Sequence, residues 1–134
     1  MSHVVHQVEL EVRWRDLDAF DHVNNASYLG YIEEARVRWF KSLSEDWAGE
    51  TAAPIMAAVA VNYRRPINWP ETVRIELIAG RVGGKSLTLE HRITSATDPN
   101  VLYCDGHTVL VWVDRSGQSV PLPGKVRAAC EPAA

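Results

Sequence analysis

Apolar side chains alternate with polar ones at the start of the chain and then change to a helical spacing. Every second residue from Val8 to Trp14 is apolar, which predicts a half-buried strand because strand side chains alternate between two faces. Intervals of three and four residues follow and predict a long amphipathic helix, whose apolar face comprises Tyr28, Ile32, Ala35, Trp39 and Leu43. Residues 44–54 lose this periodicity and carry Gly49 and Pro54, as is typical of a loop.

Alternation returns after residue 57 and predicts four more strands. Turn signals separate them: Pro66 and Pro70 around Trp69, the glycine pair within 82–85, and residues 97–100. The nearly continuous apolar run 102–113 suits a central strand, with Gly106 as a bulge or bend. The tail from Pro121 predicts at most one short helical turn.

The order of these elements predicts an α+β fold in one domain. An antiparallel sheet of five strands must cover the apolar face of the helix. One helix cannot shield the whole sheet, so we expect a second copy to cover the remaining edge or face.

Composition narrows the possible partners. A chain of 134 residues with a net charge of −3 has no electrostatic footprint for nucleic acid or an anionic membrane. Residues 1–7 do not resemble a signal peptide and no run is long enough to span a membrane, so a cytoplasmic location is expected. Cys104 and Cys130 suggest neither a disulfide framework nor a zinc site.

Reactive side chains are concentrated just before the helix. This loop contains three aspartates, a histidine and two asparagines, namely Asp16, Asp18, Asp21, His22, Asn24 and Asn25. Helix capping explains any one of the aspartates equally well, since a carboxylate accepts hydrogen bonds from free helix amides. A calcium loop would need glycine and glutamate where Asp21 and Ser27 stand, so no metal is expected.

A carboxylate beside a helix N-terminus suits thioester hydrolysis. The free amides can stabilise an oxyanion, and an ionised aspartate can attack a carbonyl or deprotonate water. A thiol has a pKa of about 8.5, so thiolate leaves with little help from an acid.

The motif itself resembles a known family. Asp-x-Asp-x-x-x-His-Val-Asn-Asn-x-x-Tyr, followed by Tyr-x-Glu-x-Ala-Arg, is similar to the start of the hotdog-fold acyl-CoA thioesterases of the 4-hydroxybenzoyl-CoA thioesterase branch. The resemblance implies a five-stranded antiparallel sheet wrapped around one long central helix, assembled as dimers or tetramers with active sites at subunit interfaces. It implies that Asp18 is the catalytic aspartate, that the Asn25 N–H polarises the thioester carbonyl, and that Tyr28 is the family tyrosine of the first helical turn.

Asp21, His22 and Asn24 depart from some family members, which have glycine and apolar residues here. His22 could orient water or the Asp18 carboxylate, or simply bond to nearby backbone. Asn24 could position water or cap the helix. Glu33 and Glu34 resemble an alternative arrangement, found in other members of the family, in which a glutamate on the helix is the base. Glutamates on helices are, however, usually solvated.

Residues 84–86, Gly-Lys-Ser, imitate the end of a phosphate-binding P-loop, but Ala79 stands where its first glycine should be, and strands follow. Nucleotide hydrolysis is therefore rejected. In the thioesterase interpretation, this turn and nearby arginines are predicted to contact the coenzyme A phosphates; the residues are Arg81, Lys85 and Ser86, with Arg64 or its neighbour Arg65. A solvated basic turn is the alternative. His91, on an apolar strand face, is expected to be a hydrogen-bonded core histidine.

These observations predict hydrolysis of an acyl-CoA or acyl carrier protein thioester, without a cofactor other than the coenzyme A of the substrate. Asp18 would be the base or the nucleophile. A non-hydrolytic dehydratase or isomerase, and a module that only binds acyl-CoA, remain as alternatives because one fold carries several functions. The Gly-x-Ser-x-Gly pattern of serine hydrolases is absent from the sequence.

Overall fold

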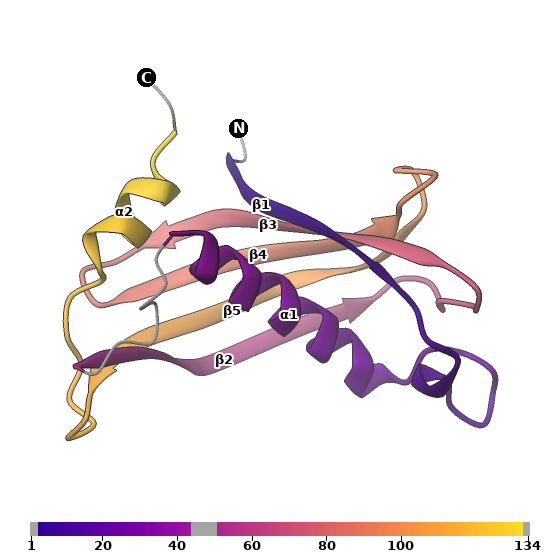
Figure 1. Cartoon of the computed structure of the whole chain (residues 1–134), viewed down its shortest axis with the longest axis horizontal. Coiled ribbons are helices and arrows are strands. Elements are labelled where there is room, and N and C mark those ends of the chain that lie inside the picture. The colour runs from indigo at the N-terminus through magenta and orange to yellow at the C-terminus, as the bar shows by residue number, and fades with distance from the viewer. Residues whose placement is uncertain (1–2, 44–50, 133–134) are drawn as a thin grey trace.

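The computed structural model describes residues 3–43 and 51–132. It contains one antiparallel sheet of five strands in the order β1-β3-β4-β5-β2 (Figure 1). The strands are β1 (His3–Glu11), β2 (Ala52–Tyr63), β3 (Thr72–Val82), β4 (Ser86–Ser95) and β5 (Leu102–Asp114). The helices are the 3₁₀ turn η1 (Trp14–Asp16), α1 (Asn25–Leu43) and α2 (Gly124–Cys130).

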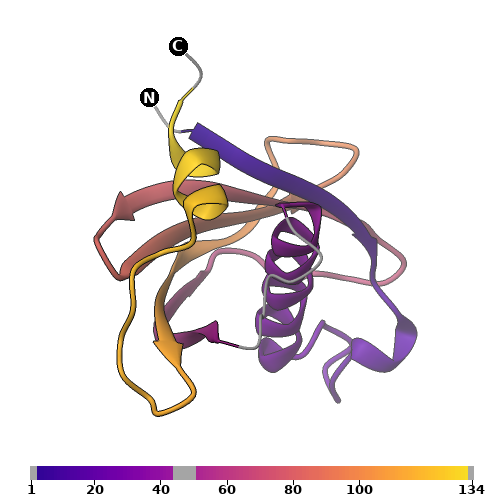
Figure 2. The same ribbon diagram turned by 60° about the vertical axis from the view of Figure 1, so that its left-hand side comes forward.

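The long helix α1 lies across one face of the curved sheet, as Figures 1 and 2 show from two directions. Its apolar stripe is buried, with Ile32, Ala35 and Trp39 each at most 1% exposed. Alternate side chains of the inner strands, such as Ile75 and Leu89, complete the same core. The predicted α+β class, with a five-stranded sheet against a long helix, is confirmed.

A second helix, α2, occupies the tail where only a single helical turn was expected. Val126 and Cys130 on α2 are buried, and Arg127 Nη2 donates a hydrogen bond to the Gly83 carbonyl at 2.7 Å. The start of β1 is held there too, since His3 Nε2 lies 3.1 Å from the Ala129 carbonyl oxygen. The helix therefore closes the core at the end of the sheet opposite the N-terminus of α1 (Figure 1).

Two strand boundaries differ from the predictions. β1 ends at Glu11, and Trp14 opens η1 with 70% of its surface exposed, so the alternation at Trp14 was misleading. β2 begins at Ala52 and contains Pro54, which the sequence had assigned to a loop. Proline is tolerated there because β2 is an edge strand, where one side of the backbone makes no sheet hydrogen bonds. The rest of the predicted loop, residues 44–50, lies outside the described residues.

Gly106 is not a bulge, because it stays in register with Val61 of β2 and His91 of β4. Its φ of +149° and its position against the Ala60 carbonyl oxygen leave no room for a Cβ atom, so glycine lets β2 and β5 approach closely. His91 is 1% exposed, as expected for the core, but neither ring nitrogen has a partner among the described residues.

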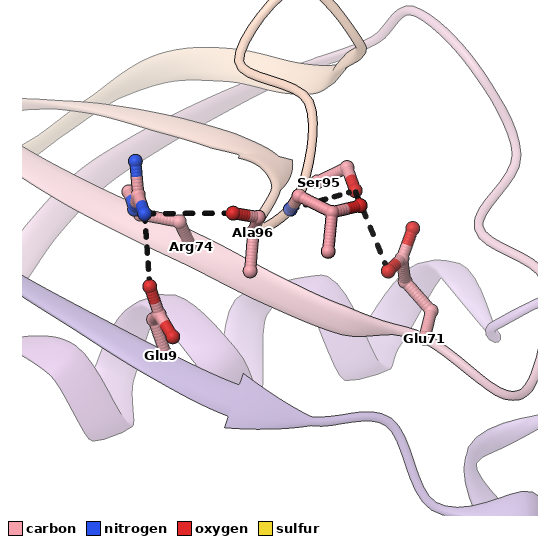
Figure 3. Close-up of polar contacts among 6 residues, drawn as sticks. Glu9, Glu71, Arg74, Ser95 and Ala96 are labelled. Carbon is pink, nitrogen blue, oxygen red and sulfur yellow. Dashed lines mark hydrogen bonds and ion pairs between the residues drawn. The ribbon is translucent and has the colours of Figure 1, made fainter.

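Polar contacts anchor the end of the sheet from which η1 emerges (Figure 3). Arg74 of β3 pairs with Glu9 of β1 at 2.9 Å and reaches the carbonyl of Ala96 beyond β4. Ser95 Oγ lies 3.5 Å from the Glu71 carboxylate just before β3. No helix in the described part of the chain has the length and apolar character needed to cross a membrane.

Candidate functional site

The loop between β1 and α1 is folded as a small hairpin that presents Asp18. An isolated bridge pairs Leu17 with Val23, and the Asp18 amide donates to the His22 carbonyl at 2.8 Å. Asp21 closes the turn with a φ of 62°, a left-handed conformation that aspartate tolerates better than most residues. The loop is therefore held at its base by backbone hydrogen bonds.

Asp18 is half-buried, and only one of its two carboxylate oxygens accepts hydrogen bonds from the described residues. Its Oδ1 accepts hydrogen bonds from the amides of Phe20 at 2.9 Å and His22 at 3.4 Å. Its Oδ2 makes no hydrogen bond to any residue in the described ranges. One oxygen thus orients the side chain, and the other is available to a ligand.

α1 begins immediately after Asn24, which caps it. Asn24 Oδ1 accepts from the Ala26 amide and the Asn24 carbonyl accepts from the Ser27 amide, both at 2.8 Å. Asn25 is the first helical residue, so its amide has no acceptor within the helix, and none of the other described residues supplies one. This leaves a free N–H at the positive end of the helix dipole.

Asp18 and Asn25 line the same cleft, which has a volume of about 400 Å³. The loop and the first helical turn form one wall, and the chain leaving β2 forms the other; the lining residues are Asp18, Phe20, His22, Val23, Asn25, Tyr28 and residues 63–66. His22 is half-buried in this wall. Asn24, whose side chain is used as a cap, is not among the lining residues.

Two tyrosines join the helix to the end of β2. Tyr63 Oη donates to the Asn25 carbonyl at 3.0 Å, and Tyr28 Oη lies 3.4 Å from the Arg65 carbonyl. Their rings meet edge to face with centroids 4.9 Å apart. Burial, followed by the nearby Cys104, Tyr63 and Asp18, raises the pKa of Tyr28 to about 12, so its hydroxyl stays protonated at neutral pH. Tyr63 is a site residue that the sequence motif did not indicate.

The two arginines after β2 differ in availability. Arg64 forms an ion pair with Asp105, in which its Nη2 and Nε donate hydrogen bonds to Oδ1 at 3.0 and 3.2 Å. Burial alone would raise the pKa of Asp105, but these hydrogen bonds lower it, and the pKa lies below its ordinary value. Arg65 lines the same cleft and forms no ion pair with any described residue. The sequence leaves open which of these two arginines contacts coenzyme A; in the structure, Arg64 pairs with Asp105, and Arg65 is the one without an ion pair among the described residues.

Comparison with known proteins identifies the family. The model of the thioesterase-like superfamily matches residues 12–130, from the end of β1 through α2. The chain belongs to the thioesterase-like superfamily.

Individual relatives extend over nearly the whole of this thioesterase-like chain. The long-chain acyl-CoA thioesterase FadM of Escherichia coli is 31% identical over 128 residues, covering 93% of this chain and 96% of FadM. The PA2801 protein of Pseudomonas aeruginosa superposes with a TM-score of 0.91 at 42% identity, covering 96% of this chain and all of that one. A thioesterase from Thermus thermophilus, crystallised with coenzyme A and zinc, gives 0.81 at 35% identity over 96% and 99% of the two chains. The expected family and its class of enzyme, a thioester hydrolase, are therefore confirmed.

The other residues predicted to contact coenzyme A lie far from this cleft. The Trp112 amide donates to the Lys85 carbonyl, whereas the Arg64 amide donates to the Tyr103 carbonyl nine residues earlier on β5. At about 3.3 Å per strand residue, the two points are about 30 Å apart. Arg81 and Ser86 flank the same β3–β4 hairpin. Within one chain, most of the length of the sheet therefore separates the predicted phosphate contacts at this hairpin from Asp18.

Both cysteines are buried. Burial raises the pKa of Cys104 to about 12 and that of Cys130 to about 11, so both thiols stay protonated. Within residues 3–43 and 51–132, no three His, Cys, Asp or Glu side chains are grouped closely enough to hold a metal ion.

Proposed function

We propose that this thioesterase-like protein hydrolyses acyl-CoA thioesters, with Asp18 as base or nucleophile and the Asn25 N–H as oxyanion donor. One observation carries the proposal: Asp18, whose carboxylate keeps one oxygen without a hydrogen bond to the described residues, and Asn25, whose amide has no acceptor among them, line the same cleft. The long-chain acyl-CoA thioesterase activity of FadM, and the coenzyme A in the Thermus thermophilus structure, support an acyl-CoA as the substrate.

The reaction needs few groups. With Asp18 as base, its Oδ2 takes a proton from water while the water oxygen attacks the thioester carbon. With Asp18 as nucleophile, Oδ2 attacks the carbon directly, and water then hydrolyses the acyl anhydride. In both routes the negative oxygen forms beside the Asn25 N–H, and the C–S bond breaks to release thiolate.

The neighbouring residues have supporting roles in this proposal. The Asn24 side chain accepts a hydrogen bond from the Ala26 amide and so caps α1. This cap fixes the direction of the Asn25 amide at the start of the helix. His22 holds the Asp18 carboxylate through its backbone amide, and its ring forms part of the cleft wall. Tyr28 is a buried wall residue whose hydroxyl points to the Arg65 carbonyl.

Arg65 is the best-placed cation for the anionic part of coenzyme A, because it is exposed at the cleft and unpaired among the described residues. Arg64 could contribute only by sharing its bonds to Asp105. Arg81, Lys85 and Ser86, at the far end of the sheet, are better placed to contribute from a second copy of the chain.

The decisive test is Asp18→Asn, which keeps the oxygen that accepts the loop amides and removes the charge. Thiol release from a panel of acyl-CoAs should fall at least about a hundredfold in turnover, within the range for lost acid–base catalysis. The matched control is Asp21→Asn in the same loop, which should keep wild-type turnover because Asp21 does not line the cleft and asparagine tolerates its positive φ.

Equal activity of Asp18→Asn and wild type would refute the assignment of Asp18. Saturable binding of acyl-CoA without thiol release by the wild type would instead indicate a binding module.

A further inference from the structure

Asp16, the first aspartate of the motif, is buried on the other side of the loop from the cleft. It is 8% exposed, and its Oδ2 accepts hydrogen bonds from Tyr31 Oη at 2.6 Å and from the Arg13 amide at 3.1 Å. Burial alone would raise its pKa, but these bonds and the Arg13 charge hold the pKa below its ordinary value. Asp16 is therefore an ionised and strong acceptor at neutral pH.

Asp16 is connected to both parts of the proposed site. Its own carbonyl accepts the amide of Asn24 at 2.8 Å, and Asn24 caps the helix start. Its carboxylate is bonded to Tyr31, on the second turn of α1. The Leu17–Val23 bridge that frames the Asp18 loop begins at the next residue.

Asp18 itself has no hydrogen bond that fixes its loop to the helix. Its carboxylate bonds only to amides of its own loop, and the loop tip at Phe20 is 80% exposed. The relative position of carboxylate and helix amide must therefore be set elsewhere. Reacting groups need positions held to about 0.5 Å, so a small shift of the loop matters.

We propose that the buried Asp16–Tyr31 hydrogen bond is a tether that positions the Asp18 carboxylate against the Asn25 amide. Asp16 and Tyr31 are positioning residues and do not touch the substrate. This inference rests on the proposed function for its effect on catalysis, whereas the tether itself can be tested without a substrate.

The test is Tyr31→Phe, which removes one hydroxyl. The matched control is Tyr103→Phe, because Tyr103 is equally buried, at 7% exposed, and its hydroxyl also donates to a carboxylate, that of Glu71. Both variants should lose similar thermal stability. Only Tyr31→Phe should lower kcat for thiol release, by about tenfold and with KM changed by less than about twofold, since the reacting groups are misplaced while binding is retained.

Hydrogen exchange supplies a readout that does not depend on activity. The Asn24 amide, which donates to the Asp16 carbonyl, should exchange at least about tenfold faster in Tyr31→Phe and in Asp16→Asn, and should be unchanged in Tyr103→Phe. Unchanged exchange in both tether variants would overturn the tether. Faster exchange in a protein whose wild type releases no thiol would support the tether and refute the proposed function. Equal kcat in Tyr31→Phe and Tyr103→Phe would overturn the catalytic role.

Discussion

At the scale of single residues, the buried His91 imidazole makes stability depend on pH. Burial, with smaller contributions from the charges of His107 and Arg36, lowers the pKa of His91 to about 4. In the unfolded chain the imidazole titrates near its ordinary value of 6.5. Between these values the unfolded state binds the proton and the folded state does not, so stability falls as the pH falls from 6.5 to 4.

We predict that His91→Gln flattens this pH dependence. The pKa difference of 6.5 − 4 corresponds to a loss of about 3 kcal/mol in the free energy of unfolding of the wild type across that interval. Urea unfolding at a series of pH values measures this loss, and His22→Gln, in the loop between β1 and α1, is the matched control because His22 is not among the groups that shift the pKa of His91. Parallel pH curves for wild type and His91→Gln would show that His91 is not the cause.

Some residues of the site can be found from a local sequence motif, and others cannot. Asp18, His22 and Asn25 lie within eight residues of one another, and a short loop before a helix necessarily keeps them close. Tyr63 and Arg65 are nearly forty residues later, at the end of an edge strand, and no local pattern distinguishes Arg65 from Arg64. Their difference arises from Asp105 on β5, which captures one guanidinium and leaves the other.

At the scale of elements, a second hollow forms a groove between α1 and β2. It has a volume of about 210 Å³, and its lining combines Leu29, Ile32, Met56 and Val59 with Glu33, Arg36 and Thr108. Because it follows Tyr28 along the helix and Tyr63 along the strand, this groove is our proposed site for the acyl chain. A long apolar acyl group would bury its methylenes there.

The groove predicts a change of chain-length preference in Leu29→Trp. The larger side chain should fill the groove and lower kcat/KM for a long-chain acyl-CoA at least about tenfold relative to a short-chain one. Val37→Trp is the matched control, because Val37 is also on α1 and is similarly exposed, at 36% against 37%, but does not line the groove. An unchanged preference in Leu29→Trp would exclude this path for the acyl chain.

At the scale of the whole molecule, β2 leaves one edge of the sheet unpaired among the described residues. Its exposed large apolar side chains are Ile55, Met56, Val59 and Tyr63, whereas β1 at the other edge exposes only Val4. We therefore propose that a second copy covers β2. Antiparallel pairing of two β2 strands would bring the β3–β4 hairpin of one copy, with Lys85, to the end of the sheet where the other copy has its cleft.

This interface predicts that Ala58→Lys weakens self-association. A lysine in the middle of the exposed strand opposes edge-to-edge pairing and should raise the dimer dissociation constant at least about tenfold. Analytical ultracentrifugation measures this dissociation constant, and Val4→Lys on β1 is the matched control. Unchanged association in Ala58→Lys, or a monomeric wild type, would contradict the interface.

The spacing of apolar residues along the chain is enough to predict the period of each main element, and hence the α+β class, the long helix and the reactive loop at its start. Periodicity is a local property, so it also misassigned Trp14 and Pro54, whose surroundings depend on which strand lies at an edge. Three features appear only in the folded molecule: Asp16 turns inward to Tyr31, Arg65 rather than Arg64 is without an ion pair among the described residues, and the Lys85 hairpin lies at the far end of the sheet. Each of these depends on strand order and on contacts between distant residues, and neither can be obtained from spacing along one segment.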